Sequence, residues 1–225
     1  MGPEYRFYTI GDLYDLTQTL AGEYLAGFTY PWEALKGIGE MIRALGEKLD
    51  PREYWEVSSQ VWVHVSAKVA PTAFLGENCI IGKDTEVRHG AFVRGNALVG
   101  DNCVVGNSVE LKNVILMNHV QVPHYNYVGD SILGTYAHMG AGSITSNVKS
   151  DKTPVMIHAG VEKMETGLKK TGAFLGDHVE VGCNSVLNPG TVIGRQARVY
   201  PLSSVRGTVP EKSIYKHQGE VVLQR

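Results

Sequence analysis

An aliphatic residue recurs at almost every sixth position between Val63 and Val209. The series is Val63, Val69, Leu75, Ile81, Val87, Val93, Val99, Val105, Leu111 and Met117, followed by Leu133, Met139, Leu175, Val181, Leu187, Ile193, Val199 and Val205. No helix has a period of six, and an ordinary strand alternates with a period of two. A six-residue repeat is typical of a parallel β-helix, so the chain is predicted to be an all-β solenoid.

A small residue recurs four positions after the aliphatic one, as at Ala67, Cys79, Ala91 and Cys103. It is expected to pack beside the aliphatic side chain in a narrow axial core. Successive coils then hydrogen-bond along the axis, about 4.8 Å apart. Cys79 and Cys103 fall on this small position and are predicted to be buried thiols with a packing role.

The chain divides into three predicted parts. Residues 1–55 lack the six-residue period and carry apolar residues at helical spacing, with Pro31 placed to begin a second helix and Asp50 to end it. This segment is predicted to be a helical cap over the open end of the β-helix, with a partner-docking or oligomer-locking hairpin as the alternative. Residues 56–209 form the solenoid, interrupted after Pro123 and by an inserted loop at about 145–170. Residues 210–225 form a C-terminal tail.

The charge and hydropathy of the chain exclude several classes of partner. A net charge of −2 and a pI near 6.4 argue against general affinity for nucleic acid or acidic membranes. No apolar run approaches the roughly 18 residues of a membrane span, and residues 1–25 make a poor signal peptide. The three cysteines form no metal-binding spacing. A cytoplasmic protein is therefore expected.

Arg94 and Lys112 each follow a core aliphatic residue directly, and they lie three full repeats apart in the sequence. If three repeats make one coil, these two cations stack on the same face of neighbouring coils. They repel each other unless an anion bridges them. A phosphate is the natural candidate, because arginine offers a fork of donors and lysine a point charge. The alternative is a pair of solvated surface cations.

The segment Val-Pro-His124-Tyr-Asn-Tyr127-Val-Gly-Asp lies at the first predicted interruption of the repeat. A histidine whose pKa is near neutral can remove a proton from an amine as the amine attacks a thioester. His124 is therefore a candidate general base. A surface or structural histidine is the alternative interpretation.

Residues 93–148 resemble the acetyltransferase half of the bacterial bifunctional enzyme that makes UDP-N-acetylglucosamine. The matching string is Val-Arg94-Gly…Gly-Asn-Ser-Val-Glu-Leu-Lys112-Asn…Pro-His124-Tyr-Asn-Tyr127-Val-Gly-Asp…Met-Gly-Ala141-Gly-Ser-Ile-Thr-Ser-Asn147. More broadly, the chain resembles the solenoid domain of archaeal sugar-1-phosphate nucleotidyltransferases that acetylate amino-sugar phosphates. Nothing in residues 1–62 resembles the nucleotide-binding loop of such enzymes, so nucleotidyl transfer is not expected.

This resemblance to the hexapeptide-repeat acyltransferases implies a fold, two substrates and an assembly. The fold is a three-sided, left-handed parallel β-helix. The acyl donor is acetyl-CoA, and the acceptor is an amino-sugar phosphate such as glucosamine-1-phosphate. The family also implies a homotrimer in which each site is shared between neighbouring solenoids.

The resemblance also implies roles for individual residues. His124 matches the general base, Arg94 and Lys112 match the residues that hold the sugar phosphate, and Tyr127 matches a tyrosine at the same ligand. Ala141 and Asn147 match positions that line the acetyl-CoA and acceptor site. Five positions differ in type from the family: His138 stands at a sugar-contacting asparagine, Val148 at a tyrosine, Cys183 at a CoA-contacting serine, Pro201 at an alanine and Gln218 at an arginine.

Two alternative functions remain open at this point. Carbonic anhydrases of the γ type share the solenoid and bind zinc through three histidines, two of them separated by a characteristic short spacing. His119 and His124 have that spacing, with His89 or His138 as a third ligand. The second alternative is a solenoid that binds sugar phosphate without catalysis, which the substitutions at CoA-facing positions favour. The preferred prediction is a CoA-dependent N-acyltransferase that acetylates an amino-sugar 1-phosphate for nucleotide-sugar synthesis.

Overall fold

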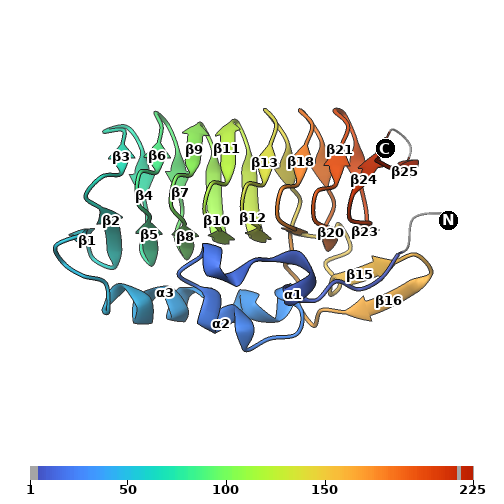
Figure 1. The fold of residues 1–225 in the computed structure, drawn as a ribbon, viewed down its shortest axis with the longest axis horizontal. Helices are drawn as coiled ribbons and strands as arrows, with labels where there is room; N and C mark the ends of the chain where they lie inside the picture. Colours follow the sequence, from blue (N-terminus) through green and yellow to red (C-terminus); the bar gives the residue numbers. More distant parts are fainter. Residues whose placement is uncertain (1–4, 217–218, 225) are drawn as a thin grey trace.

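Three short strands and three corners make up each coil of the solenoid (Figure 1). The computed structural model describes residues 5–216 and 219–224. Strands in neighbouring coils pair in parallel, as where Val61, Trp62 and Val63 pair with Cys79, Ile80 and Ile81. The chain is the all-β, left-handed parallel β-helix that was expected.

The three sides of the solenoid are called faces 1, 2 and 3. Face 1 consists of β2 (Val61–His64), β5 (Cys79–Ile81), β8 (Ala97–Val99), the second halves of β10 (Glu110–Leu116) and β12 (Tyr127–Leu133), β17 (Ala173–Leu175), β20 (Thr191–Ile193) and β23 (Thr208–Val209). Face 2 consists of β3 (Lys68–Val69), β6 (Glu86–Val87), β9 (Val104–Asn107), β11 (Gln121–His124), β13 (His138–Met139), β18 (Glu180–Val181), β21 (Arg198–Val199) and β24 (Ser213–Tyr215). Face 3 consists of β4 (Phe74–Leu75), β7 (Phe92–Val93), the first halves of β10 and β12, β14 (Ile144–Thr145), β19 (Val186–Leu187) and β22 (Ser204–Val205).

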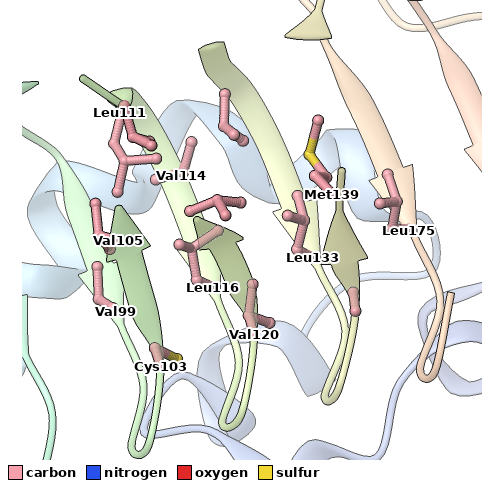
Figure 2. Close-up of a cluster of buried hydrophobic side chains, with 14 of the residues drawn as sticks. Val99, Cys103, Val105, Leu111, Val114, Leu116, Val120, Leu133, Met139 and Leu175 are labelled. Carbon is pink, nitrogen blue, oxygen red and sulfur yellow. The ribbon is translucent and has the colours of Figure 1, made fainter. Parts of the chain in front are cut away.

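The inward-facing residues of all three faces form one buried axial core (Figure 2). Cys79 and Cys103 belong to this core, as predicted, and burial raises the pKa of each thiol to about 12. Many corners between strands are made by a residue with a positive φ, such as Asn96 and Tyr125, which lets the chain turn within few residues.

The register of the core differs from the prediction at one corner. Leu111 pairs with Val93, which precedes it by three full repeats. Val114 pairs with Ala97, and this separation is one residue shorter than three repeats. The shorter corner moves Leu116 into the inward position and turns Met117 outward, towards the helices. The assignment of Met117 to the axial core was therefore wrong, and the solenoid continues through Pro123 without the predicted interruption.

Both ends of the solenoid are bordered by antiparallel strands. At the N-terminal end β1 (Tyr54–Ser58) pairs with β2, and at the C-terminal end β25 (Val221–Leu223) pairs with β24. The parallel coil runs on to Tyr215, beyond the predicted boundary at 209. Each added strand occupies backbone groups that the terminal coil would otherwise leave unpaired on that face.

The N-terminal segment is helical, but it lies along face 1 and not over the open end of the solenoid (Figure 1). Its elements are α1 (Ile10–Leu13), η1 (Leu16–Gln18), α2 (Gly22–Ala26), η2 (Pro31–Gly37) and α3 (Ile38–Gly46). The predicted end cap is thus corrected to a lateral cover. None of the described helices is long and apolar enough to cross a membrane.

The physical reason for the lateral position is a second apolar column, on the outside of face 1. From β2 to β20, one apolar residue of each strand on this face points outward and is buried against the N-terminal segment or the inserted loop. The column consists of Trp62, Ile80, Leu98, Ile115, Ile132, Phe174 and Val192. Covering these side chains removes a large apolar area from water, which favours packing along the face.

The inserted loop leaves the coil after β14 and returns at β17. It contains the hairpin of β15 (Met156–Ala159) and β16 (Glu162–Glu165). Ile157 is fully buried and Met164 packs against the same cluster as the helices. The hairpin therefore continues the cover of face 1 beside β20 and β23, at the C-terminal end of the molecule (Figure 1).

Candidate functional site

Arg94 and Lys112 occupy neighbouring coils at the corner between faces 3 and 1, as their spacing predicted. The Arg94 N–H donates to the carbonyl of Leu111 over 2.8 Å, which fixes the two coils against each other. Each cation has a carboxylate partner: Arg94 Nη1 lies 2.8 Å from Glu110 Oε1, and Lys112 Nζ lies 2.8 Å from Asp130 Oδ1. The repulsion expected between the two cations is thus relieved by the protein itself.

The two ion pairs differ in burial. The side chains of Arg94 and Glu110 are 47% and 35% exposed, whereas those of Lys112 and Asp130 are 27% and 5% exposed. The hydrogen bond from Arg94 to Glu110 raises the pKa of the guanidinium further, but solvent screens an exposed ion pair of this kind, so it contributes little to stability. Glu110 can therefore give way to a stronger anion, while Asp130 stays in place beneath Lys112.

Asp130 is the centre of a polar network at this corner. Its Oδ1 accepts hydrogen bonds from Lys112 Nζ at 2.8 Å and from Asn113 Nδ2 at 2.9 Å. Its Oδ2 accepts from Asn147 Nδ2 at 2.6 Å. One ammonium N–H of Lys112 is used in this way, which leaves two for a ligand. The carboxylate thus orients two of the predicted substrate-binding residues, Lys112 and Asn147.

Tyr127 extends across face 3 towards the same network. Its hydroxyl accepts a hydrogen bond from Asn147 Nδ2 at 3.1 Å. Burial raises the pKa of the Tyr127 phenol, and the nearby Asp130 raises it further, so the group stays protonated at neutral pH. Gly129 lies under the ring, where a Cβ would collide with the Tyr127 hydroxyl. The ring can lie flat against the coil because this position has no side chain.

His124 lies at the opposite edge of face 3, at the corner with face 2. Its side chain is exposed and has no hydrogen-bond or salt-bridge partner among residues 5–216 and 219–224. Its carbonyl accepts from the N–H of Gly142, which places Ala141 beside it in the next coil. The register continues this column through Cys183 and Pro201. The predicted base and three predicted CoA-contacting positions therefore share one edge.

Of the other substituted positions, His138 lies apart from these two edges. His138 begins its strand on face 2, beyond the corner with face 1, and its Nδ1 lies 2.8 Å from Glu180 Oε2. It lines a depression of about 310 Å³ together with Gln121 and Tyr136. The predicted contact of His138 with the sugar is thus not supported within one chain. Val148 is 42% exposed at the base of the inserted loop, and Gln218 lies outside the described residues.

The geometry does not support the zinc alternative. His119 stacks on Tyr136, with ring centroids 4.3 Å apart, at the corner where β11 begins, whereas His124 lies at the end of that strand. The two imidazoles do not converge within the chain. Across the part of the chain that the structure describes, no three histidine, cysteine, aspartate or glutamate side chains are grouped so that they could hold a metal ion.

Glu110 and Asp130 were not predicted from the sequence to have a role at this site. Both belong to the string that carries the family resemblance, in Val-Glu110-Leu-Lys112 and in Val-Gly-Asp130. A signal was available for Asp130, because it follows Lys112 by three full repeats and therefore lies near it in the next coil. The direction of its side chain was not predictable, since it depends on the positive φ of this residue.

Several known proteins are similar to this chain. The family model for the GMPPB C-terminal domain matches residues 79–193. Over 106 residues the chain is 34% identical to a bifunctional sugar-1-phosphate nucleotidylyltransferase/acetyltransferase from Sulfurisphaera tokodaii, which covers 47% of this chain and 26% of that protein. Over 198 residues it is 26% identical to the bifunctional protein GlmU of Methanococcus maripaludis, covering 87% of this chain and 48% of that protein. The chain thus spans about a quarter to a half of the length of these relatives.

Two solved structures are also similar. AntD, an N-acyltransferase from Bacillus cereus in complex with dTDP and coenzyme A, has a TM-score of 0.41 at 17% identity and covers 74% of this chain and 81% of its own. A perosamine N-acetyltransferase from Caulobacter crescentus in complex with CoA and GDP-perosamine has a TM-score of 0.31 at 18% identity. That match covers 84% of this chain and 67% of the other.

Proposed function

The chain belongs to the family of the GMPPB C-terminal domain, and from this premise we propose that it is a CoA-dependent N-acyltransferase that acetylates an amino-sugar 1-phosphate. The two curated relatives described above are named as bifunctional proteins, one of them explicitly as an acetyltransferase. The proposal concerns acetyl transfer alone, because the resemblance to these enzymes lies in the solenoid.

The observation that carries the proposal is the arrangement around face 3. A cationic, hydrogen-bonding network with Lys112 and Asn147 lines one edge, and the unpartnered imidazole of His124 lines the other. Tyr127 connects them, since it begins the strand just after the His124 corner and its hydroxyl reaches Asn147. An acceptor with a phosphate at one end and an amine at the other fits such a pair of edges.

The residues of the chain then divide the chemistry between them. Lys112 and Arg94 hold the phosphate, with Glu110 displaced from Arg94 by the stronger anion. Tyr127 and Asn147 orient the sugar between the edges, which contributes to the rate by proximity. His124 takes the proton from the amine as its nitrogen forms a bond to the thioester carbonyl carbon. The carbon–sulfur bond then breaks, and coenzyme A leaves as the thiol.

The assembly and the cellular location are part of the same proposal. Phe74 and Phe92 remain 58% and 43% exposed on face 3, with ring centroids 5.5 Å apart. An exposed aromatic pair on a flat face suits packing against a neighbouring subunit, as the expected homotrimer requires. The cytoplasmic location inferred from sequence stays a prediction.

The test is release of thiol from acetyl-CoA with glucosamine-1-phosphate, galactosamine-1-phosphate and unphosphorylated glucosamine as acceptors. We expect turnover that requires the phosphate. The His124→Ala variant should lower kcat by about 10²–10⁴-fold, the range typical of a general base. His178→Ala is the matched control, because that exposed histidine stacks on Tyr136 at the corner between faces 1 and 2 and has no predicted role; it should leave kcat unchanged.

Two results would contradict the proposal. The first is turnover that His124→Ala leaves intact, which would remove the assigned base. The second is the absence of turnover with every acceptor although a sugar phosphate binds with an affinity that depends on Lys112. That result would favour a non-catalytic sugar-phosphate binder.

A further inference from the structure

A second group of cations lies where the inserted hairpin meets the solenoid. It consists of the cations Lys149, Lys163 and Arg206 together with the imidazole of His158, and is called the hairpin cation cluster. His158 and Lys163 face each other across the hairpin. Arg206 occupies the corner between faces 3 and 1, and the following residue, Gly207, lies so close to His158 that a Cβ there would be 2.9 Å from the His158 carbonyl oxygen. The hairpin and the last coils thus bring the cations together.

The electrostatics of this cluster differ from those at the Arg94 and Lys112 corner. Partial burial, and then the charges of Lys163, Arg206 and Lys149, lower the pKa of His158, so these cations act on one imidazole. Lys149 has a carboxylate nearby, with Asp151 Oδ2 at 3.3 Å. In the described part of the chain no carboxylate pairs with Lys163 or Arg206 in a salt bridge.

Other polar groups do not neutralise the cluster. Arg206 Nη2 makes one long hydrogen bond, 3.4 Å, to the amide oxygen of Asn188. Glu165 lies opposite Met156 on the same side of the hairpin as Lys163, without a salt bridge to it. Lys163 and Arg206 are both exposed and so accessible to a ligand. Lys163 and Arg206, which have no carboxylate partner in the described part of the chain, therefore favour the binding of an anion.

The position of the cluster indicates what kind of anion. Arg206 lies on the same corner as Lys112, four coils further along the axis, at about 4.8 Å per coil or roughly 19 Å in all. Between them the outward residues of face 3 include Ile144 and Val186, which are half-buried and apolar. A ligand that runs along face 3 from the acceptor site beside His124 to Arg206 has a reactive end, an elongated arm and a phosphate-bearing end. Acyl-CoA has this form.

We propose that the hairpin cation cluster binds the phosphate groups at the nucleotide end of the acyl-CoA substrate. This inference rests on the proposed function for the identity of the donor, but the binding of a phosphate ester at the cluster does not. Arginine and lysine supply forked and point-charge donors to phosphate oxygens. The apolar residues of face 3 then contact the arm, and the thioester lies near His124 and Tyr127.

The experiment measures binding by calorimetry without any turnover. The probes are 3′,5′-ADP, which represents the nucleotide end of CoA, together with UDP and inorganic phosphate. We expect 3′,5′-ADP to bind more tightly than the other two, and its Kd to rise at least tenfold in Lys163→Ala and in Arg206→Ala. Arg198→Ala removes an exposed arginine on face 2 as the matched control and should leave the Kd unchanged. Unaltered melting temperatures check the fold of each variant.

The outcomes separate this inference from the proposed function. An unchanged Kd for 3′,5′-ADP in both cluster variants, or an equal loss in Arg198→Ala, overturns the site. Binding of UDP or phosphate as tight as that of 3′,5′-ADP overturns the assignment to acyl-CoA. If acetyl transfer occurs and the KM for acetyl-CoA is the same in wild type and Arg206→Ala, the function stands and the site fails. If 3′,5′-ADP binds through the cluster and no acetyl transfer occurs, the nucleotide-phosphate site stands without the function.

Discussion

Faces 1 and 3 share the same coils and the same axial core, yet one is covered and the other is open. The outward residues of face 1 are apolar from Trp62 to Val192 and are buried beneath the helices and the hairpin. Those of face 3 change from Phe74 and Phe92 to Glu110, Tyr127 and finally Ser204, and they leave the face accessible. The inward residues therefore specify the solenoid, and the outward residues decide which side carries structure and which can carry chemistry.

The largest expected effect of this difference is on stability. Phe174 is fully buried on the outside of face 1 and packs against Trp32, with ring centroids 6.0 Å apart. We expect Phe174→Ala to lower the free energy of unfolding by about 3–5 kcal/mol, through lost burial and the cavity left behind. In the dissociated chain, Phe92→Ala removes the same side chain from the open face and should cost no more than about 1 kcal/mol.

Chemical denaturation followed by circular dichroism measures both variants under one set of conditions. A similar loss of stability in the two variants would contradict the distinction between a covered and an open face. It would then follow that face 3 is buried in the protein in solution, as in the expected homotrimer. Repeating the experiment at several protein concentrations distinguishes that case, because stability that comes from association rises with concentration.

The period of six predicted the axial core because it reports the inward position alone. It treats the three faces as equivalent, and so it did not reveal where the helices pack. The sequence does contain a pattern that indicates the covered face, and its period is one whole coil. Ile80 and Leu98 lie three full repeats apart. Ile115 and Ile132 continue the same column, each at a step one residue shorter. Apolar residues on both sides of one strand in every three predict a covered face.

The site was predictable in part for the same geometric reason. Arg94 and Lys112 meet because their spacing equals one coil, and spacing is visible in a sequence. Their partners depend on how individual side chains leave the corners, which spacing does not determine. The shorter corner after Leu111 likewise moved Met117 out of the core, because a single missing residue changes which side chains point inward.

Asp130 and Asp177 are two buried carboxylates whose substitution compares the open face 3 with the covered face 1. The side chains of Asp130 and Asp177 are 5% and 6% exposed. Asp130 receives three side-chain donors at the network of face 3, whereas Asp177 accepts from the backbone N–H groups of Asp15 and Thr135 and ties the N-terminal segment to the solenoid. One carboxylate therefore orients predicted ligand contacts, and the other holds the cover.

We expect Asp130→Asn to raise the KM for the amino-sugar phosphate at least tenfold, with a smaller change in kcat. The reason is that an amide offers one acceptor oxygen where the carboxylate offered two, so its NH₂ group must face a donor from Lys112, Asn113 or Asn147. Asp177→Asn should lower the melting temperature and leave the KM unchanged. Steady-state kinetics with varied acceptor, and calorimetric binding of the acceptor, measure the effect. An equal rise in KM for both variants would show that the carboxylate acts only on the fold.

The smallest expected effect concerns the three cysteines. Two of them, Cys79 and Cys103, lie in the axial core, and Cys183 lies at the edge of face 3. Burial raises the pKa of Cys79 and of Cys103 to about 12, so neither forms an appreciable thiolate at pH 8, whereas Cys183 is exposed on the edge that also carries His124. A chromogenic disulfide reagent should therefore modify one thiol quickly in the native protein and three after denaturation. Desulfo-CoA, which has no thiol of its own, should leave the rate of Cys183 modification unchanged, because the proposed donor phosphates lie at Arg206, on the opposite edge of face 3. Slower modification in the presence of desulfo-CoA would place the donor along the Cys183 edge and count against its binding at Arg206.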